Sequence, residues 1–84
     1  MIKTYVKKPV VIEAVRWTGD NIDEIIKFCG DSLTFKGSKP SRIYINTLEG
    51  RCLCSPHDYI IKGVDYGFYP CKSDVFKQIY EEVE

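Results

Sequence analysis

The last third of the chain, residues 55–76, constrains the fold more than any other segment, because its turns and apolar runs permit few alternatives. Residues 59–62 (YIIK) are typical of a strand and are bounded on both sides by turn-forming residues. Residues 66–69 (YGFY) then return as an antiparallel partner. From about Lys72 the apolar spacing becomes helical, and Ser73 and Asp74 suit a helix start. The segment therefore predicts strand, turn, strand and helix.

The spacing of apolar residues in the first two thirds of the chain predicts further strands and one more helix. Residues 10–17 are rich in β-branched side chains on both faces, which favours an interior strand, or a strand covered by a helix on one side and by a partner or loop on the other. Residues 22–29 have the apolar spacing of a short helix that ends at Gly30. Residues 33–35 predict a brief strand, and residues 42–47 and 51–54 predict a hairpin.

These elements predict one α+β domain over residues 1–84, in the order β-α-β-β-β-β-β-α. We expect a small antiparallel sheet of four to five strands, twisted or partly rolled, with two helices packed on it. A chain of 84 residues has no room for a second core. Open edges in such a small sheet invite pairing between chains, so we expect a homo-oligomer, most simply a two-fold dimer.

The charge balance bears on which partners the protein can bind, and the cysteines bear on the cellular compartment in which it folds. Twelve basic and twelve acidic residues cancel, so neither generic nucleic-acid binding nor attraction to an anionic membrane is expected. The N-terminal segment has no apolar run of signal-peptide length, and no stretch has the length of a membrane span. We therefore expect a cytoplasmic location, where the four cysteines are free thiols.

The sequence does not predict a catalytic or metal site. Cys52, Cys54, His57 and Cys71 have the residue types of a zinc site, but Cys-x-Cys in an extended strand separates the thiols too far for tetrahedral ligation. His57 is the only histidine, and its adjacency to Asp58 does not orient it for nucleophilic catalysis. We therefore predict a protein that is not an enzyme and that has no catalytic residue, no metal and no cofactor.

Three segments resemble a family of small uncharacterised bacteriophage and prophage proteins. They are KPVVIEAVRWTG at residues 8–19, LEG at residues 48–50 and DYIIKGV at residues 58–64, which continues to YPCK at residues 69–72. The chain departs from the family pattern at His57, where glycine is usual, and at Ser73, where proline is usual. The resemblance implies a phage or prophage origin and a location in an infected or lysogenic bacterial host.

The aromatic and arginine residues suggest a binding surface. Aromatic rings beside arginines can stack a base and pair a phosphate, which favours a nucleotide-like ligand. The candidate ligand-binding residues are Arg16, Trp17, Arg42, Tyr44, Arg51, Tyr66 and Tyr69. Together with the resemblance, they predict a non-enzymatic phage protein that counteracts host defence, either by sequestering a nucleotide-type signal or by blocking a host protein. The alternative is a structural or accessory phage protein that acts through self-assembly.

Overall fold

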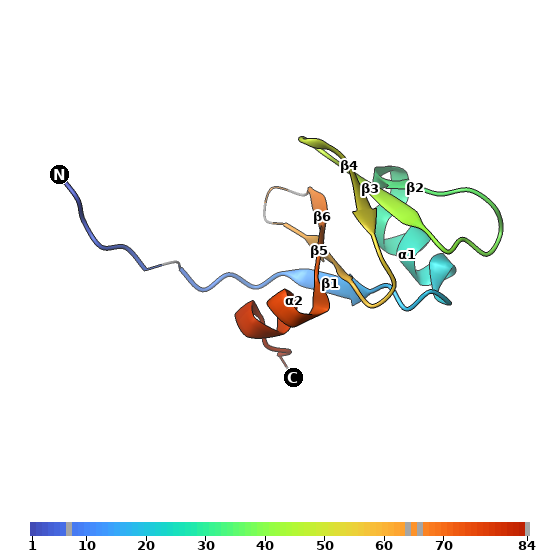
Figure 1. Ribbon diagram of the computed structural model, residues 1–84. Coiled ribbons are helices and arrows are strands. Elements are labelled where there is room, and N and C mark those ends of the chain that lie inside the picture. Colours follow the sequence, from blue (N-terminus) through green and yellow to red (C-terminus); the bar gives the residue numbers. More distant parts are fainter. Residues whose placement is uncertain (7, 64, 66, 84) are drawn as a thin grey trace.

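The computed structural model describes residues 1–6, 8–63, 65 and 67–83 of the chain (Figure 1). Its elements are β1 (Glu13–Arg16), α1 (Ile22–Cys29), the 3-10 turn η1 (Gly30–Ser32), β2 (Leu33–Thr34), β3 (Ile43–Thr47), β4 (Gly50–Cys54), β5 (Tyr59–Lys62), β6 (Phe68–Cys71) and α2 (Ser73–Ile79). The α+β class and the order of strands and helices predicted from the sequence are confirmed. Among the described residues, no helix has the length and apolar character needed to cross a membrane.

The described strands form two antiparallel sheets instead of one sheet of four to five strands. One sheet has the order β1-β5-β6 and the other has the order β2-β3-β4. The break falls between β4 and β5, where residues 55–58 make a tight turn: the Asp58 amide donates to the Ser55 carbonyl at 3.0 Å, and the Asp58 carboxylate accepts from the Ser55 amide at 3.0 Å. The chain therefore leaves one sheet and enters the other, and β6 lies against β3 and β4.

The hydrophobic core lies between the two sheets and α1. It contains buried side chains from both sheets and from the helix: Trp17, Ile25, Cys29, Ile43, Ile45, Cys54 and Ile60. Within β3 the alternation is strict, since Ile43 and Ile45 are fully buried while Tyr44 is half-buried and Asn46 is exposed. One face of the β2-β3-β4 sheet therefore packs on the core and its other face is directed outward.

The first strand is shorter than residues 10–17, and it lies at a sheet edge. Its pairing with β5 ends at Glu13 opposite Lys62, because β5 itself ends there. Residues 10–12 consequently precede the paired strand, and Val11 is 86% exposed. In Figure 1 the chain before β1 runs away from the rest of the molecule, which accounts for the longest dimension of 52 Å.

The second strand of the last hairpin is shifted from its predicted position, whereas α2 (Ser73–Ile79) begins at Ser73 as predicted. β6 covers residues 68–71 instead of 66–69, and it includes Pro70 opposite Ile60. Proline is tolerated here because β6 is an edge strand. α2 follows after Lys72, and its Phe76 ring stacks on the Tyr59 ring of β5 with a centroid distance of 3.9 Å and an angle of 7°. This contact fixes α2 beside the β1-β5-β6 sheet.

The turn before β5 keeps the backbone conformation for which glycine is best suited. His57 has φ of 80°, in the left-handed region, which a residue with a Cβ adopts only with strain. Main-chain bonds hold this turn to the end of β1, since the Trp17 amide donates to the Asp58 carbonyl at 2.9 Å and the His57 amide donates to the Trp17 carbonyl at 2.5 Å. The turn is therefore part of the contact between the first strand and the rest of the sheet.

Candidate functional site

The outward face of the β2-β3-β4 sheet carries polar and aromatic side chains from each of its strands. Tyr44 and Asn46 of β3 alternate with the buried isoleucines, and the register places them opposite Leu53 and Arg51 of β4. Thr34 of β2 is opposite Tyr44 and accepts a hydrogen bond from the Asn46 side-chain amide at 3.1 Å. We call this surface the sheet face: Thr34, Arg42, Tyr44, Asn46, Arg51 and Leu53.

Two arginines and one tyrosine give the sheet face its chemistry. The Arg51 guanidinium lies 5.8 Å from the centroid of the Tyr44 ring, a cation–π arrangement across the diagonal between β3 and β4. Arg42 immediately precedes β3 and is exposed, and its alternation with buried Ile43 directs it to the same side as Tyr44. The structure thus brings together two of the candidate residues that the sequence suggested, Tyr44 and Arg51.

A second arginine–tyrosine pair lies on the other sheet. The Arg16 guanidinium is 5.7 Å from the centroid of the Tyr59 ring, its direct partner in the β1–β5 register. The Arg16 Nε–H also donates to the His57 carbonyl at 3.3 Å, so this side chain supports the turn before β5. Arg16 is therefore separate from the sheet face, and its contacts are those of a structural residue.

The remaining candidate residues do not join either pair. Trp17 is fully buried in the core, so the suggestion that it contacts a surface ligand is corrected: its ring packs the interior, and its Nε1–H has no hydrogen-bond partner in the described part of the chain. Tyr69 is 40% exposed, and burial together with a hydrogen bond to Tyr80 raises its pKa above the usual value. Tyr66 lies outside the described residues.

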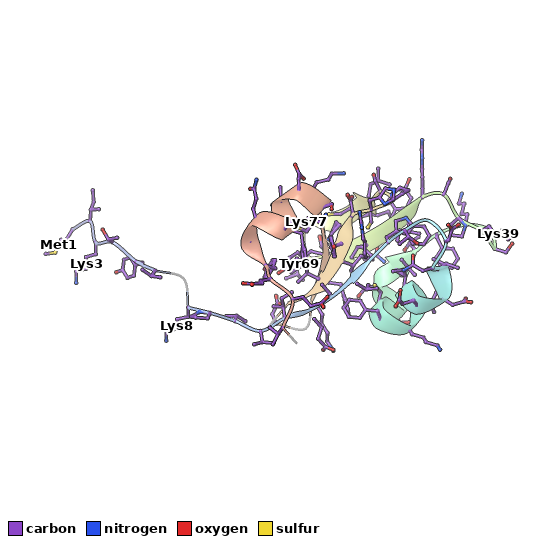
Figure 2. The ribbon with its side chains drawn as sticks, turned by 90° about the horizontal axis from the view of Figure 1, so that it is seen from below. Met1, Lys3, Lys8, Lys39, Tyr69 and Lys77 are labelled. Carbon is purple, nitrogen blue, oxygen red and sulfur yellow. The ribbon has the colours of Figure 1, made fainter. Side chains whose placement is uncertain are left out.

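An apolar groove lies between the start of β1 and α2. It has a volume of about 920 Å³, within the range of small-molecule sites. Its walls come from four parts of the chain, and we call it the α2 groove: Pro9, Val10, Val11, Ile12, Glu13, Ala14, Phe28, Tyr59, Phe76, Lys77, Tyr80, Glu81, Glu82 and Val83. In Figure 2, Lys77 lies on α2 near the labelled Tyr69.

The polar groups around the α2 groove are mostly acidic. Glu13, Glu81 and Glu82 line it together with one cation, Lys77, among the residues that the structure describes there. An apolar hollow with an acidic rim disfavours a phosphate-bearing ligand, because like charges repel. The sequence did not indicate this groove: the helical spacing of Phe76 and Tyr80 was visible, but the elements that face them were not.

The cysteines do not form a metal centre in the described part of the chain. No group of three or more His, Cys, Asp or Glu side chains there is placed to hold an ion, and the four thiols are unpaired with one another. Burial raises the pKa of the Cys29 thiol to about 11. Burial, with the nearby Asp58 carboxylate, raises the pKa of the Cys54 thiol to about 12. Both thiols therefore stay protonated and act as apolar packing groups.

Comparison of the chain with protein-family models, with curated proteins and with solved structures found no match.

Proposed function

We propose that the protein is a non-enzymatic binding protein that captures a nucleotide-type small molecule on the sheet face. The observation that carries this proposal is the Arg51–Tyr44 pair on an outward sheet surface, with the exposed Arg42 directly before β3. A tyrosine ring and a guanidinium plane both stack on a base, and arginine pairs a phosphate through two parallel hydrogen bonds. The face thus offers both groups that a nucleotide needs for recognition.

The sheet face suits such a ligand better than the α2 groove does. Arg42 and Arg51 are the charged residues of the sheet face, whereas glutamates predominate around the groove. Asn46 and Thr34 add a side-chain amide and a hydroxyl that can bond a sugar or a base edge. Electrostatic attraction therefore directs an anion to the sheet face.

The biological role that we attach to this binding follows the resemblance to phage and prophage proteins. In that role the protein acts in the cytoplasm of an infected or lysogenic bacterium and counteracts host defence by removing a nucleotide-type signal. An open face covers one side of its ligand, so we expect a Kd between about 1 µM and 1 mM. Sequestration at that affinity requires the protein to be abundant, because it must exceed its Kd in concentration.

Calorimetry tests the proposal directly. The intact protein is titrated with a panel of mono-, cyclic and cyclic di-nucleotides, with inorganic phosphate as an anion that has no base. We expect heat with at least one nucleotide, and a 10- to 100-fold weaker Kd for Arg51→Met, about the worth of one charge-assisted hydrogen bond. Tyr44→Leu removes the stacking ring and weakens binding by about 1–3 kcal/mol.

Lys27→Met is the matched control, because it removes one exposed cation from the last turn of α1, outside the sheet face. It leaves the Kd unchanged if binding depends on the sheet face and not on net charge. Absence of heat with every nucleotide at millimolar concentration contradicts the sequestering role. The remaining role for the sheet face would then be to block a host protein, and Arg51→Met would have to weaken the binding of that host protein.

A second candidate function is that of a structural or accessory phage protein that acts through self-assembly. It is favoured by a separate observation, the exposed apolar residues before β1 next to the apolar α2 groove. Light scattering on the intact protein tests it, since a strict monomer at high concentration would exclude a role that depends on assembly.

A further inference from the structure

The described residues before β1 form an extended segment that runs away from the rest of the molecule over most of its length (Figure 1). Residues 1–6 and 8–12, which we call the N-terminal arm, contain no helix or strand. Ile2 is fully exposed, and Val6 and Val11 are nearly so. The radius of gyration is 14.2 Å, against about 12 Å for a compact chain of this length. The arm therefore leaves apolar, strand-forming side chains in water (Figure 2).

The edge of β1 offers this arm a pairing partner. β1 is the terminal strand of its sheet, hydrogen-bonded to β5 on one side, and no described strand pairs along its other side. The main-chain amide and carbonyl groups along that open edge can bond to an added extended segment. The arm continues directly from β1, so two copies related by a two-fold axis can run their arms antiparallel past each other.

The α2 groove lies next to the same edge and offers an apolar surface for the arm of another copy. Val10 and Ile12, at the base of the arm, already form one wall, and Phe76 and Tyr80 form the opposite one. An arm from a second copy that enters between these walls would bury β-branched side chains against aromatic rings. The α2 groove is thus an apolar surface beside an open strand edge.

Charge complementarity indicates that the N-terminal arm of a second copy occupies the α2 groove. Residues 1–12 contain lysines and no acidic residue. The groove presents Glu13, Glu81 and Glu82 with a single lysine, Lys77. In Figure 2, Lys3 lies on the arm, away from the helices and strands. A second copy of this chain therefore supplies an apolar, basic segment that matches an apolar, acidic groove.

From these observations we propose that two copies exchange their N-terminal arms, so that each arm lies along the β1 edge and in the α2 groove of its partner. The interface is isologous, because the same arm and groove face each other twice about the two-fold axis. This inference deepens the self-assembly function and concerns a surface other than the sheet face. Oligomeric state and nucleotide binding are measured separately, so either proposal can fail while the other holds.

Sedimentation velocity on the full chain tests the exchange. We expect the wild-type protein to form dimers whose dissociation constant increases with salt concentration, because exposed charges are screened. An arm variant, Lys3→Glu with Lys8→Glu, places acidic residues against the acidic groove. A groove variant, Glu81→Lys with Glu82→Lys, places basic residues against the basic arm. Each variant alone should dimerise at least about tenfold more weakly than the wild type.

Mixing the two variants provides the decisive measurement. The acidic arm of one variant then meets the basic groove of the other, and the basic arm meets the acidic groove, so a heterodimer should form with an affinity close to that of the wild type. Glu49→Lys, in the β3–β4 turn and outside the groove, is the matched control and should not change dimerisation. The proposal is overturned if the wild type stays monomeric throughout the concentration range. It is also overturned if each variant dimerises like the wild type, or if the mixture forms no heterodimer.

Val11→Asp tests the apolar part of the same contact. Val11 is 86% exposed within one chain, so a folding defect is not expected from this change. Circular dichroism should be that of the wild type, while the dimer dissociation constant rises. If Val11→Asp dimerises like the wild type, the arm does not lie against a partner.

Discussion

The Lys72 ammonium nitrogen lies 3.2 Å from the Oδ2 atom of Asp58, a residue that is only 6% exposed. The same Oδ2 atom accepts a hydrogen bond from the Ser55 main-chain amide at 3.0 Å. Asp58 therefore ties the turn between the two sheets to the residue that precedes α2. The two side chains differ in exposure, since the Lys72 side chain is 64% exposed and that of Asp58 is 8% exposed.

This difference predicts unequal effects of removing the two partners. Asp58→Ala should lower the free energy of unfolding by about 1–3 kcal/mol, because the half-buried Ser55 amide loses its acceptor. Lys72→Met should cost less than about 1 kcal/mol, because water already screens the exposed ammonium group. Urea unfolding of both variants and of the double variant gives the coupling energy between them. A loss for Lys72→Met equal to that for Asp58→Ala would contradict this assignment.

His57→Gly should stabilise the protein. His57 has φ of 80°, which costs an L-residue about 1–2 kcal/mol, and the greater freedom of glycine in the unfolded chain offsets part of the gain. We expect a net gain of about 0.5–1 kcal/mol, or a rise in Tm of a few degrees by calorimetry. His57→Ala is the control, because alanine keeps the Cβ and the strain. Equal stabilisation by alanine would show that the imidazole, and not the backbone, is the source of the cost.

Stability should fall at alkaline pH because of the buried thiols. The pKa values of Cys29 and Cys54 are raised by burial to about 11 and 12, from an ordinary value of 9.0. The folded state therefore holds these protons more tightly than the unfolded state does. Their contribution is fully present below pH 9 and is lost as the pH rises from 9 towards 11–12, by up to about 1.4 kcal/mol per pH unit for each thiol.

Urea unfolding at several pH values between 8 and 11 measures this loss. Cys54→Ala should be less stable than the wild type at pH 8, because it leaves a cavity, but its stability should fall less steeply above pH 9. Cys52→Ser is the comparison, since Cys52 is only half-buried. An unchanged slope in Cys54→Ala would remove this thiol as a cause of the alkaline loss.

Trp17 should behave as a core residue in every measurement. Its fluorescence should be blue-shifted and poorly quenched by acrylamide, and a nucleotide should not change it by direct contact. Trp17→Ala should cost about 3–5 kcal/mol, much of the stability of a domain of this size. Leu48→Ala, at a fully exposed position of the β3–β4 turn, should leave the Tm unchanged. Efficient quenching of Trp17 in the folded protein would contradict its placement in the core.

The elements that follow local patterns were predictable. α1 begins and ends where the apolar spacing and Gly30 indicate, and β5 covers the predicted residues. The β3–β4 hairpin was also anticipated, because alternation and the turn at Glu49 and Gly50 both act over a few residues. The same alternation placed Tyr44 on the sheet face, so that part of the candidate site could be found from the sequence.

Features that depend on distant partners could not be predicted in this way. Residues 10–12 have the composition of a strand, yet they are unpaired in the single chain because β5 ends opposite Glu13. Proline disfavours a strand because it has no backbone N–H to donate to a neighbouring strand. Pro70 nevertheless lies in β6, because β6 is an edge strand and needs no such donor on its open side. Trp17 has the chemistry of a ligand contact, and only its burial between the sheets assigns it to the core.

The class of the fold, the order of its elements and the outward face of the β3–β4 hairpin follow from the spacing of neighbouring side chains along the sequence. Three features emerge only when the chain folds: the strands divide into two sheets, Arg16 and Arg51 lie in separate pairs, and an acidic apolar groove lies beside the N-terminal arm. The reason is physical: each of these features requires residues far apart in the chain to meet, and short-range patterns do not specify such meetings.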